Sequence, residues 1–258
     1  MELTAAVAVI TGAGSGIGAA AAKRFARAGM RVVLVGRTAD ELDGVAREIG
    51  AAGGEARVAD VADSAALQRA IDDGAAAWGR LDVVVANAGV NGVWAPIEEL
   101  AVEEFESTLR TNLVGTFLTI KHAVPHLKRR GGSVIVTASV NGTRIFSNTG
   151  ATAYSASKAG QVAMTKMLAV ELARHRIRVN VVCPGAIDTA IDDNTERRHL
   201  ESAKVPVEYP EGEIPLTRGR PGTSDDFAEL MLFLASDAAR HVTGTEVWID
   251  GAESLVVG

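Results

Sequence analysis

Short Val-rich runs alternate with longer amphipathic segments along this chain, and that alternation constrains its fold more than any other feature. Runs of strand length lie at 5–11, 31–36, 55–60, 81–89, 132–139, 177–185 and 245–251. Segments with helical periodicity lie at 16–29, 39–53, 64–79, 102–130, from Tyr154 onward and at 224–236. Strands that alternate with helices in this way predict a parallel sheet buried on both faces. We expect an α/β fold, with one doubly wound domain over residues 1–258 and a seven-stranded parallel sheet flanked by helices.

Composition narrows the class of protein. A hydrophobic fraction of 47% and a charged fraction of 22% are typical of a globular protein with a large core. The net charge of -6 argues against nucleic acid and anionic membranes as partners, because both favour a basic surface. The single cysteine, Cys183, suits a reducing compartment. The first apolar run lacks a basic leader, and no run approaches the ~20 residues of a membrane span. We therefore expect a cytoplasmic protein, and no metal site.

The sequence TGAGSGIG at 11–18 connects the first expected strand to the first expected helix. It follows the pattern T-G-x-x-x-G-x-G, because Ile17 stands where the more usual G-x-G-x-x-G fingerprint has its last glycine. Glycines let the backbone approach a pyrophosphate, whose charge then meets the N–H groups and the positive dipole end of the helix. The position of this turn predicts a Rossmann-type dinucleotide site. Its expected cofactor contacts are Gly12, Ser15, Gly16, Ile17 and Gly18.

The second expected strand, at 31–36, ends in residues that bear on the choice of cofactor. Dinucleotide folds often place an acid here to bond the ribose 2′-hydroxyl of NAD, whereas a basic residue accommodates the 2′-phosphate of NADP. This chain has Gly36 and then Arg37, so the acid is missing and a cation is present. We predict that NADP(H) is favoured over NAD(H), with Arg37 as a contact. The alternative is a solvated arginine that begins the next loop.

One of the two tyrosines, Tyr154, lies in the sequence AYSASK, with Lys158 four residues later. On a helix the two side chains share a face, so the ammonium charge lowers the pKa of the phenol from its ordinary value near ~10. Such a tyrosine can exchange a proton with a carbonyl or alcohol oxygen near neutral pH. Ser139 follows the fifth expected strand, at the edge where open α/β sheets bind ligands, and its hydroxyl can hold the same oxygen. The alternative is an amphipathic helix with an incidental ring and charge.

Together these motifs resemble the short-chain dehydrogenase/reductase family in its standard single-domain branch, and in particular its 3-oxoacyl-carrier-protein reductase-like members. The matching segments are TGAGSGIG (11–18), DV (60–61), NAG (87–89), Asn112, Ser139, YSASK (154–158), PGAIDT (184–189), IPLTRGRPG (214–222) and VTGTEVWIDG (242–251). The resemblance implies hydride transfer between a nicotinamide cofactor and a ketone or secondary alcohol. It implies a general acid/base tyrosine among four catalytic residues, which are Asn112, Ser139, Tyr154 and Lys158.

Further roles follow from the resemblance alone. Asn112 would interrupt the fourth helix and hold a water in a proton relay to Lys158, and a local kink for packing is the alternative. Tyr154 and Lys158 would also contact the cofactor. Its other expected contacts are Asp60, Val61, Asn87, Ala88 and Gly89 on the adenosine side, and Pro184, Gly185, Ile187 and Thr189 along the nicotinamide. The chain departs from the family pattern in two extra residues between Ser139 and Tyr154, in ANAG for NNAG, and in Ala252 for a second glycine.

The remaining segments bear on substrate and partners. The expected walls of the pocket for a small carbonyl or alcohol substrate are Trp94, the loop with Asn141, Arg144 and Phe146, and a charged lid at about 189–222. Basic residues at 128–130 and 174–178 resemble those that receive an acidic carrier protein, and pairing with helix C-terminal dipoles is the alternative. The segment 159–172 is apolar on nearly all sides, which predicts a homotetramer, or a dimer, through the fourth and fifth helices.

Other functions share parts of this pattern. A nucleotide-binding redox sensor without turnover would not need the tyrosine and lysine, and both are present. An epimerase or dehydratase of the family's longer branch shares Tyr-x-x-x-Lys, but the glycine spacing and the lack of a sizeable C-terminal substrate domain count against it. A carrier-linked 3-oxoacyl reductase is one specific activity. The sequence leaves the substrate, the stereochemistry and the physiological direction open.

Overall fold

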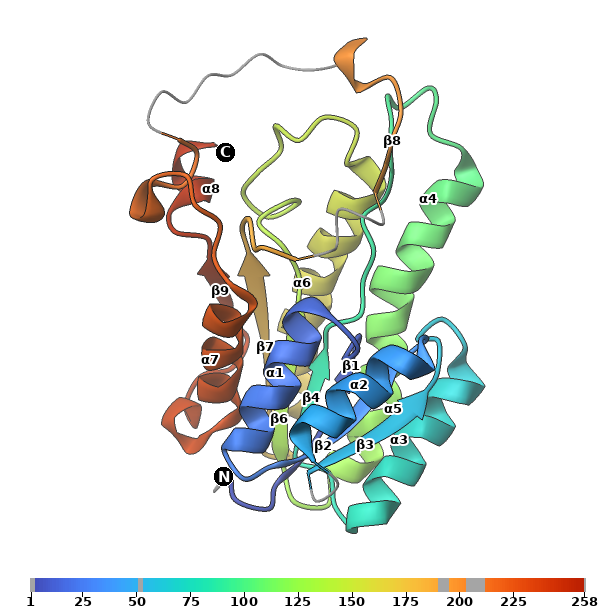
Figure 1. Cartoon of the computed structure of the whole chain (residues 1–258), viewed down its shortest axis with the longest axis vertical. Helices are drawn as coiled ribbons and strands as arrows, with labels where there is room; N and C mark the ends of the chain where they lie inside the picture. The colour runs from blue at the N-terminus through green and yellow to red at the C-terminus, as the bar shows by residue number, and fades with distance from the viewer. Residues whose placement is uncertain (1–2, 51–52, 190–194, 203–211, 258) are drawn as a thin grey trace.

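A computed structural model describes residues 3–50, 53–189, 195–202 and 212–257 (Figure 1). The strands are β1 (Val7–Thr11), β2 (Arg31–Gly36), β3 (Gly54–Val58), β4 (Val83–Ala86), β5 (Gly92–Trp94), β6 (Gly132–Thr137), β7 (Ile177–Pro184), β8 (Thr195–Arg197) and β9 (Glu246–Ile249). The α-helices are α1 (Gly16–Arg27), α2 (Ala39–Ile49), α3 (Ser64–Trp78), α4 (Val102–Leu109), α5 (Gly115–Leu127), α6 (Thr152–Ala173), α7 (Ser224–Ala235) and α8 (Glu253–Val256). A π-helical turn, Arg110–Val114, joins α4 to α5.

Seven strands form one parallel sheet in the order β3-β2-β1-β4-β6-β7-β9, which confirms the predicted fold class. The chain moves outward from β1 through β2 and β3, and then crosses back to place β4 on the other side of β1. Open α/β sheets bind ligands at the carboxyl ends of the strands beside such a reversal. The glycine-rich turn that follows β1 therefore lies where a ligand is expected.

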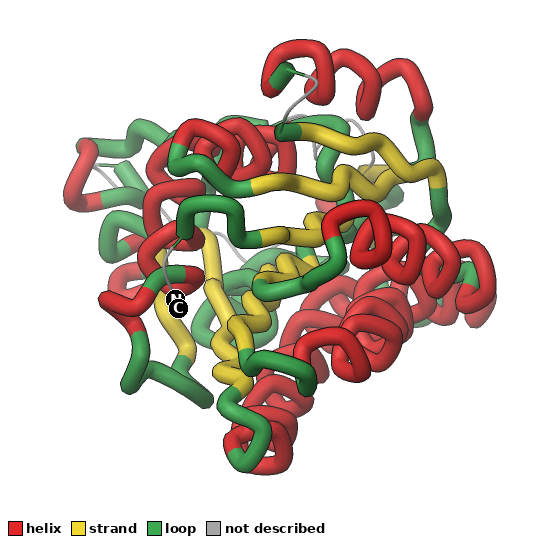
Figure 2. The backbone as a smooth tube through the Cα atoms, turned by 90° about the horizontal axis from the view of Figure 1, so that it is seen from below, coloured by secondary structure: helices red, strands yellow, loops and turns green. Residues whose placement is uncertain are grey.

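Helices cover both faces of the sheet (Figure 2). Side chains of α3, α5 and α6 pack on one face, and those of α1, α2 and α7 pack on the other. On β2, Val33 and Val35 join the first layer, while Val32 and Leu34 join the second. A strand buried on both faces needs apolar residues at successive positions, which is why these strands read as continuous Val-rich runs.

The observed elements differ from the expected ones at four places. The helix expected over 102–130 contains the π-helical turn, and the helix expected to begin at Tyr154 begins at Thr152. The two-stranded parallel sheet of β5 and β8 was not anticipated, because strands of three residues are too short to show a period of two. Helix α8 was not anticipated either.

The segment predicted as a lid, 189–222, falls only partly within the described residues. Residues 190–194 and 203–211 lie outside the described residues. Within the described part of the chain, no helix combines the length and the apolar character that crossing a membrane requires.

Candidate active site

The turn between β1 and α1 brings the backbone into close contact with itself. Gly12 and Gly16 have φ angles of 66° and 49°, in the left-handed region that favours glycine. A Cβ on Gly18 would clash with the carbonyl oxygen of Gly12. The observed geometry therefore favours glycine at positions 12 and 16 and leaves no space for a side chain at Gly18.

The first turn of α1 leaves its N–H groups open to a ligand. Ser15 is the N-cap residue, but its side chain accepts no hydrogen bond from the helix, and the first turn contains no acidic residue. Uncapped N–H groups and the helix dipole favour an anion at this point. A helix N-terminus without a cap, beside a turn in which Gly12 and Gly18 leave no room for a Cβ, fits the pyrophosphate of a dinucleotide. Ser15 and Ile17 lie in the same turn.

Asn87 ties this turn to the end of β4. Its Nδ2 donates hydrogen bonds to the carbonyl oxygens of Thr11 and Gly12, at 3.1 and 3.4 Å. The N–H groups of Asn87 and Ala88 both donate to Thr11 Oγ1, at 3.1 and 3.2 Å. These hydrogen bonds from Asn87 and Ala88 stabilise the conformation of the glycine turn.

Three other residues with predicted cofactor contacts, Arg37, Asp60 and Val61, lie after β2 and β3. Asp60 Oδ1 accepts the N–H of Ala62 at 2.8 Å, so this carboxylate shapes its own turn. Val61 is buried against Gly115, where a Cβ would collide with the valine side chain. Arg37 is exposed just beyond β2, and no described carboxylate lies within ion-pair distance of its guanidinium.

Helix α6 carries Tyr154 and Lys158 one turn apart on its buried face. Lys158 is only 3% exposed, and its Nζ donates to the carbonyl oxygen of Thr137, 2.9 Å away at the end of β6. The same Nζ lies 5.4 Å from the centroid of the Tyr154 ring. Burial lowers the pKa of Lys158 from 10.5 to about 8. A backbone carbonyl, and not a carboxylate, therefore holds this ammonium group beside the phenol ring.

Ser139 lies two residues beyond Thr137, at the same edge of the sheet. It is buried, and its Oγ accepts the N–H of Asn141 at 3.1 Å. The N–H of Val140 donates to the carbonyl oxygen of Pro184 at 2.9 Å, which ties this segment to the end of β7. The structure thus places Ser139 and Lys158 around the end of one strand.

Asn112 lies in the π-helical turn and is fully buried. Its Oδ1 accepts the N–H of Val90 and its Nδ2 donates to the carbonyl oxygen of Val90, both at 2.9 Å. Nδ2 also donates to Ser157 Oγ at 3.0 Å, so Asn112 connects the segment after β4 to the helix that carries Lys158. A Cβ on Gly89 would lie 3.3 Å from Asn112 Oδ1 and 3.5 Å from Lys158 Nζ, so any larger residue would crowd both polar atoms.

Two further side chains hold the backbone carbonyl of Asn112. Thr116 Oγ1 donates to it at 2.7 Å, and Gln161 Nε2 donates to it at 2.9 Å. Both acceptor positions of this carbonyl are therefore engaged by the protein, and the water relay at Asn112 stays a prediction. Ser157 and Gln161 were not predicted from the sequence. Their signal was a pair of polar residues, four apart, on the same face of α6 as Lys158.

The segment 184–189 is fixed from two sides. Gly222 N donates to the carbonyl oxygen of Ala186 at 3.0 Å, and Ala186 N donates to Glu253 Oε2 at 2.8 Å. A Cβ on Gly185 would clash with that carboxylate. Burial raises the pKa of Glu253, while the hydrogen bond from Ala186 opposes this shift. The role of Glu253 was not predicted from the sequence, because its partner is 67 residues away and no local pattern marks it.

Only part of the expected substrate wall lies beside Tyr154. The ring centroid of Trp94 is 6.5 Å from that of Tyr154. Phe146 is largely exposed, at 73%. Arg144 stacks its guanidinium on the ring of Trp248, 3.6 Å from the centroid, so it is engaged with β9.

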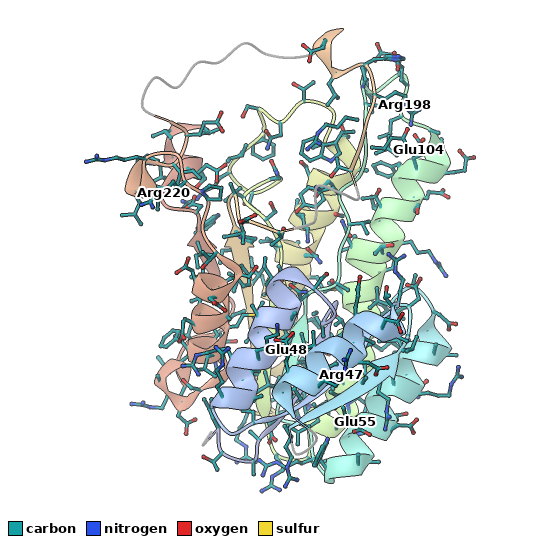
Figure 3. The ribbon with its side chains drawn as sticks, in the orientation of Figure 1. Arg47, Glu48, Glu55, Glu104, Arg198 and Arg220 are labelled. Atoms are coloured by element: carbon teal, nitrogen blue, oxygen red, sulfur yellow. The ribbon has the colours of Figure 1, made fainter. Side chains whose placement is uncertain are left out.

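The described part of the expected lid is anchored next to Trp94. Strand β8 pairs with β5, the strand that ends in Trp94, and Asn91 Nδ2 donates to Thr195 Oγ1 at 2.7 Å. Arg198 reaches Glu104 on α4, with 2.5 Å between Nη2 and Oε1 (Figure 3). These contacts hold residues 195–202 over the Trp94 side of the site.

The basic segments at 128–130 and 174–178 lie at the opposite edge of the sheet. They follow α5 and α6 and lead into the amino ends of β6 and β7, whereas Lys158 faces the carboxyl end of β6. At 1.5 Å per residue, the 16 residues from Lys158 to Arg174 span about 24 Å of helix. Among the described residues, no three or more His, Cys, Asp or Glu side chains form a group that could hold a metal ion.

Comparisons with known proteins find similar chains. A family model described as enoyl-(acyl carrier protein) reductase matches residues 12–252. A 3-oxoacyl-[acyl-carrier-protein] reductase of Thermotoga maritima is 37% identical over 254 residues, which cover 97% of this chain and 98% of the relative. The cis-4-hydroxycyclohexanecarboxylate dehydrogenase of Sinomonas cyclohexanicum is 38% identical over 255 residues, with 97% of each chain covered. Relatives of nearly equal similarity thus carry the names of different substrates.

A solved structure is similar to this chain in both fold and sequence. The crystal structure of a 3-ketoacyl-ACP reductase from Sinorhizobium meliloti 1021 matches with a TM-score of 0.92 and 52% sequence identity. The match covers 97% of this chain and 99% of that one. Fold and chain length are therefore shared almost completely.

Proposed function

This chain belongs to the short-chain dehydrogenase/reductase family, and on that premise we propose how its residues divide the work of the site. The protein is an NAD(P)-dependent oxidoreductase that transfers a hydride between a nicotinamide cofactor and a ketone or secondary alcohol. The nicotinamide accepts or supplies the hydride when it is bound. The remaining steps are proton transfer and positioning, and they fall to side chains of the protein.

Tyr154 is the general acid/base. In the direction of reduction its hydroxyl gives a proton to the carbonyl oxygen, and in oxidation the phenolate takes the proton of the alcohol. Lys158 stabilises the phenolate with its ammonium charge, 5.4 Å from the ring centroid. Ser139 Oγ accepts a hydrogen bond from Asn141, which leaves its own proton to hold the substrate oxygen. The buried Lys158, fixed to Thr137 beside Tyr154, is the observation that carries this proposal.

The test is the variant Tyr154→Phe, which keeps the ring and removes the proton. We expect loss of nicotinamide oxidation and reduction at saturating cofactor, with little change in cofactor affinity measured by fluorescence titration. Lys158→Met should also abolish turnover, whereas Lys166→Met on the same helix should not, because Lys166 is paired with Glu246 on its exposed face. Full activity of Tyr154→Phe would overturn the mechanism.

Asn112 and Gln161 act in this proposal as positioning residues. Asn112 links Val90 to Ser157, and Gln161 holds the carbonyl oxygen of Asn112. The π-helical turn thereby fixes one side of the site against the helix of Lys158. The glycine turn and the segments at Asp60, Asn87 and Pro184–Thr189 are proposed to hold the cofactor.

NADP(H) is the proposed cofactor of choice. Arg37 is exposed at the end of β2 and has no described carboxylate partner, so it is free to meet a 2′-phosphate. Glu41 opposes this preference, since its carboxylate lies against Gly14 of the glycine turn, where a Cβ would be 2.8 Å from Oε2. We expect Arg37→Ala to raise the Michaelis constant for NADPH more than that for NADH, while Arg47→Ala on the outer side of α2 changes neither. A clear preference of the wild type for NADH would refute the assignment.

A 3-oxoacyl thioester is the first substrate to try, because the Sinorhizobium reductase is 52% identical over nearly the whole chain. A panel should include cyclic alcohols, given the Sinomonas relative. Arg129 and Arg174 lie at the edge of the sheet opposite Lys158. This position within one chain gives no support for the docking of a carrier protein on these residues. If Arg129→Glu and Arg174→Glu leave the turnover of a carrier-bound substrate unchanged, docking there is excluded.

We propose a homotetramer, or a dimer, through α4, α5 and α6. Met167 and Val170 on α6 are 74% and 81% exposed, and Phe117 on α5 is also exposed. Large apolar side chains on one surface favour burial by a second copy. Light scattering that gives the mass of one chain would refute this.

We also propose that the chain forms one domain with a lid at about 189–222, and that the protein is cytoplasmic. The regulator without turnover is not favoured, because the tyrosine and lysine are present and the relatives are named as reductases and dehydrogenases.

A further inference from the structure

A cavity of about 680 Å³ opens at the amino edge of the sheet, opposite the candidate active site. It lies between the start of β6, the start of β7 and the segment that follows α7, toward the lower end of Figure 1. Five arginines line it, namely Arg80, Arg130, Arg176, Arg178 and Arg240. This volume is within the range of sites that hold small organic ligands.

The charge of the cavity is opposite to that of the chain. Asp82 and Asp237 are the acidic residues of its lining, so the wall carries a net charge of +3 in a chain of net charge -6. Asp82 is already engaged by Arg80, at 2.7 and 2.8 Å, and by the N–H of Val7 at 2.9 Å. A concave wall with one sign of charge concentrates the electric field and attracts counter-ions.

Arg178 lines this cavity and carries one unpaired donor nitrogen. Its Nη2 donates to the carbonyl oxygens of Ala235 and Ser236, at 3.4 and 3.2 Å. Its Nη1 is buried and has no hydrogen-bond partner among the described residues. Buried polar groups are almost always paired, so the unpaired Nη1 leaves Arg178 with hydrogen-bonding capacity that the described residues do not use.

Arg176 is held on the cavity wall by an unfavourable backbone. Its φ angle is 58°, in the left-handed region that residues with a side chain rarely adopt. The neighbouring Gly131 has a φ of 85°, and a Cβ there would lie 2.7 Å from the carbonyl oxygen of Arg176. Glycine or asparagine would fit this conformation better, yet the position carries an arginine. Strained residues of this kind cluster at ligand sites.

We propose that this cavity, which we call the amino-edge cavity, binds a small phosphorylated anion. Arginine guanidinium groups match phosphate oxygens in a planar, two-point geometry, and several arginines around one cavity favour a ligand with more than one negative charge. The site is separate from the glycine turn, which lies at the carboxyl edge of the same sheet. It can therefore be filled while the dinucleotide is bound.

The probe is inorganic pyrophosphate, titrated by calorimetry into protein that is saturated with NADPH. Arg176→Gln and Arg178→Gln should each weaken binding about tenfold or more, because each removes a charge-assisted hydrogen bond. Arg129→Gln is the matched control, since Arg129 precedes Arg130 but does not line the cavity, and it should change affinity less than twofold. If the variant at the partly buried Arg178 fails to fold, the variant at the exposed Arg176 still tests the proposal.

A second titration with ADP identifies the source of the phosphate. Tighter binding of ADP than of pyrophosphate points to a nucleotide, and equal affinity points to the phosphate groups alone, and both outcomes support the site. The proposal is overturned if the NADPH-saturated protein shows no saturable binding of either probe, or if Arg176→Gln and Arg178→Gln both bind as the wild type does. Because binding is measured without turnover, failure here is distinct from failure of the proposed reaction.

Discussion

Replacing Lys158 by methionine should make the cofactor-free protein more stable while it removes the activity. The ammonium group is buried with no carboxylate of the described residues in ion-pair contact, and its Nζ donates a hydrogen bond to the carbonyl oxygen of Thr137. Burial lowers the pKa of Lys158 from 10.5 to about 8. Each pKa unit corresponds to about 1.4 kcal/mol, so keeping this lysine charged at pH 7 costs about 3 kcal/mol.

Methionine fills a similar volume without a charge. The lost hydrogen bond to Thr137 takes back about 1 kcal/mol, which leaves a gain of about 2 kcal/mol in the free energy of unfolding. For a chain of this length, that gain raises Tm by about 4–8 °C. Lys166→Met, on the exposed face of the same helix, removes only a surface ion pair with Glu246, and should change stability by less than about 1 kcal/mol.

The sign of the pH dependence tests the cause. Between pH 8 and 10.5 the unfolded chain holds a proton on Lys158 that the folded chain has lost, so the stability of the wild type rises with pH across this window. The advantage of Lys158→Met should therefore be full below pH 8 and vanish above about pH 10.5. Urea and thermal unfolding at pH 7 and pH 10 measure it. A lower Tm than the wild type at pH 7, or an equal gain at both pH values, would refute the reasoning.

Three further substitutions address the cofactor turn, the π-helical turn and the segment after β7. Gly18→Ala forces a Cβ onto the carbonyl oxygen of Gly12 and should destabilise the fold by about 1–3 kcal/mol and weaken dinucleotide binding, measured by fluorescence titration; wild-type affinity would contradict this. Asn112→Ala removes three buried hydrogen bonds and should cost about 2–4 kcal/mol in urea unfolding and lower kcat, so an unchanged kcat argues against its positioning role. Burial raises the pKa of Glu253, so this carboxylate is protonated, and its hydrogen bond from Ala186 is weakened, at a higher pH than for an ordinary carboxyl group. The KM for the cofactor should therefore change on the acidic side of its pH profile, and Glu253→Gln should remove that change. A change that persists in the variant would point to another group.

The chain order of strands and helices was predictable because it depends on local patterns. A strand buried on both faces needs consecutive apolar residues, and a helix needs a period near 3.6, so both are visible in the sequence. The same holds for the glycine turn, whose function depends on backbone freedom at adjacent positions. The pairing of Tyr154 with Lys158 is equally local, since a spacing of four residues on a helix places both on one face.

Contacts between distant segments were not predictable in the same way. The partners of Asn112, the hold of Glu253 on Ala186, and the stacking of Arg144 on Trp248 each join residues that the fold alone brings together. The amino-edge cavity exists only because the starts of two strands and the end of α7 meet there.

The sequence by itself thus determined the family, the parallel sheet and the candidate proton-transfer residues, since each of these rests on spacing along the chain. Only the tertiary structure decided which groups hold those residues in place, how deeply Lys158 is buried, and where the arginines of the amino-edge cavity gather. The physical reason is that burial, desolvation and hydrogen bonding depend on neighbours in space, and those neighbours are set by how the helices pack against the sheet.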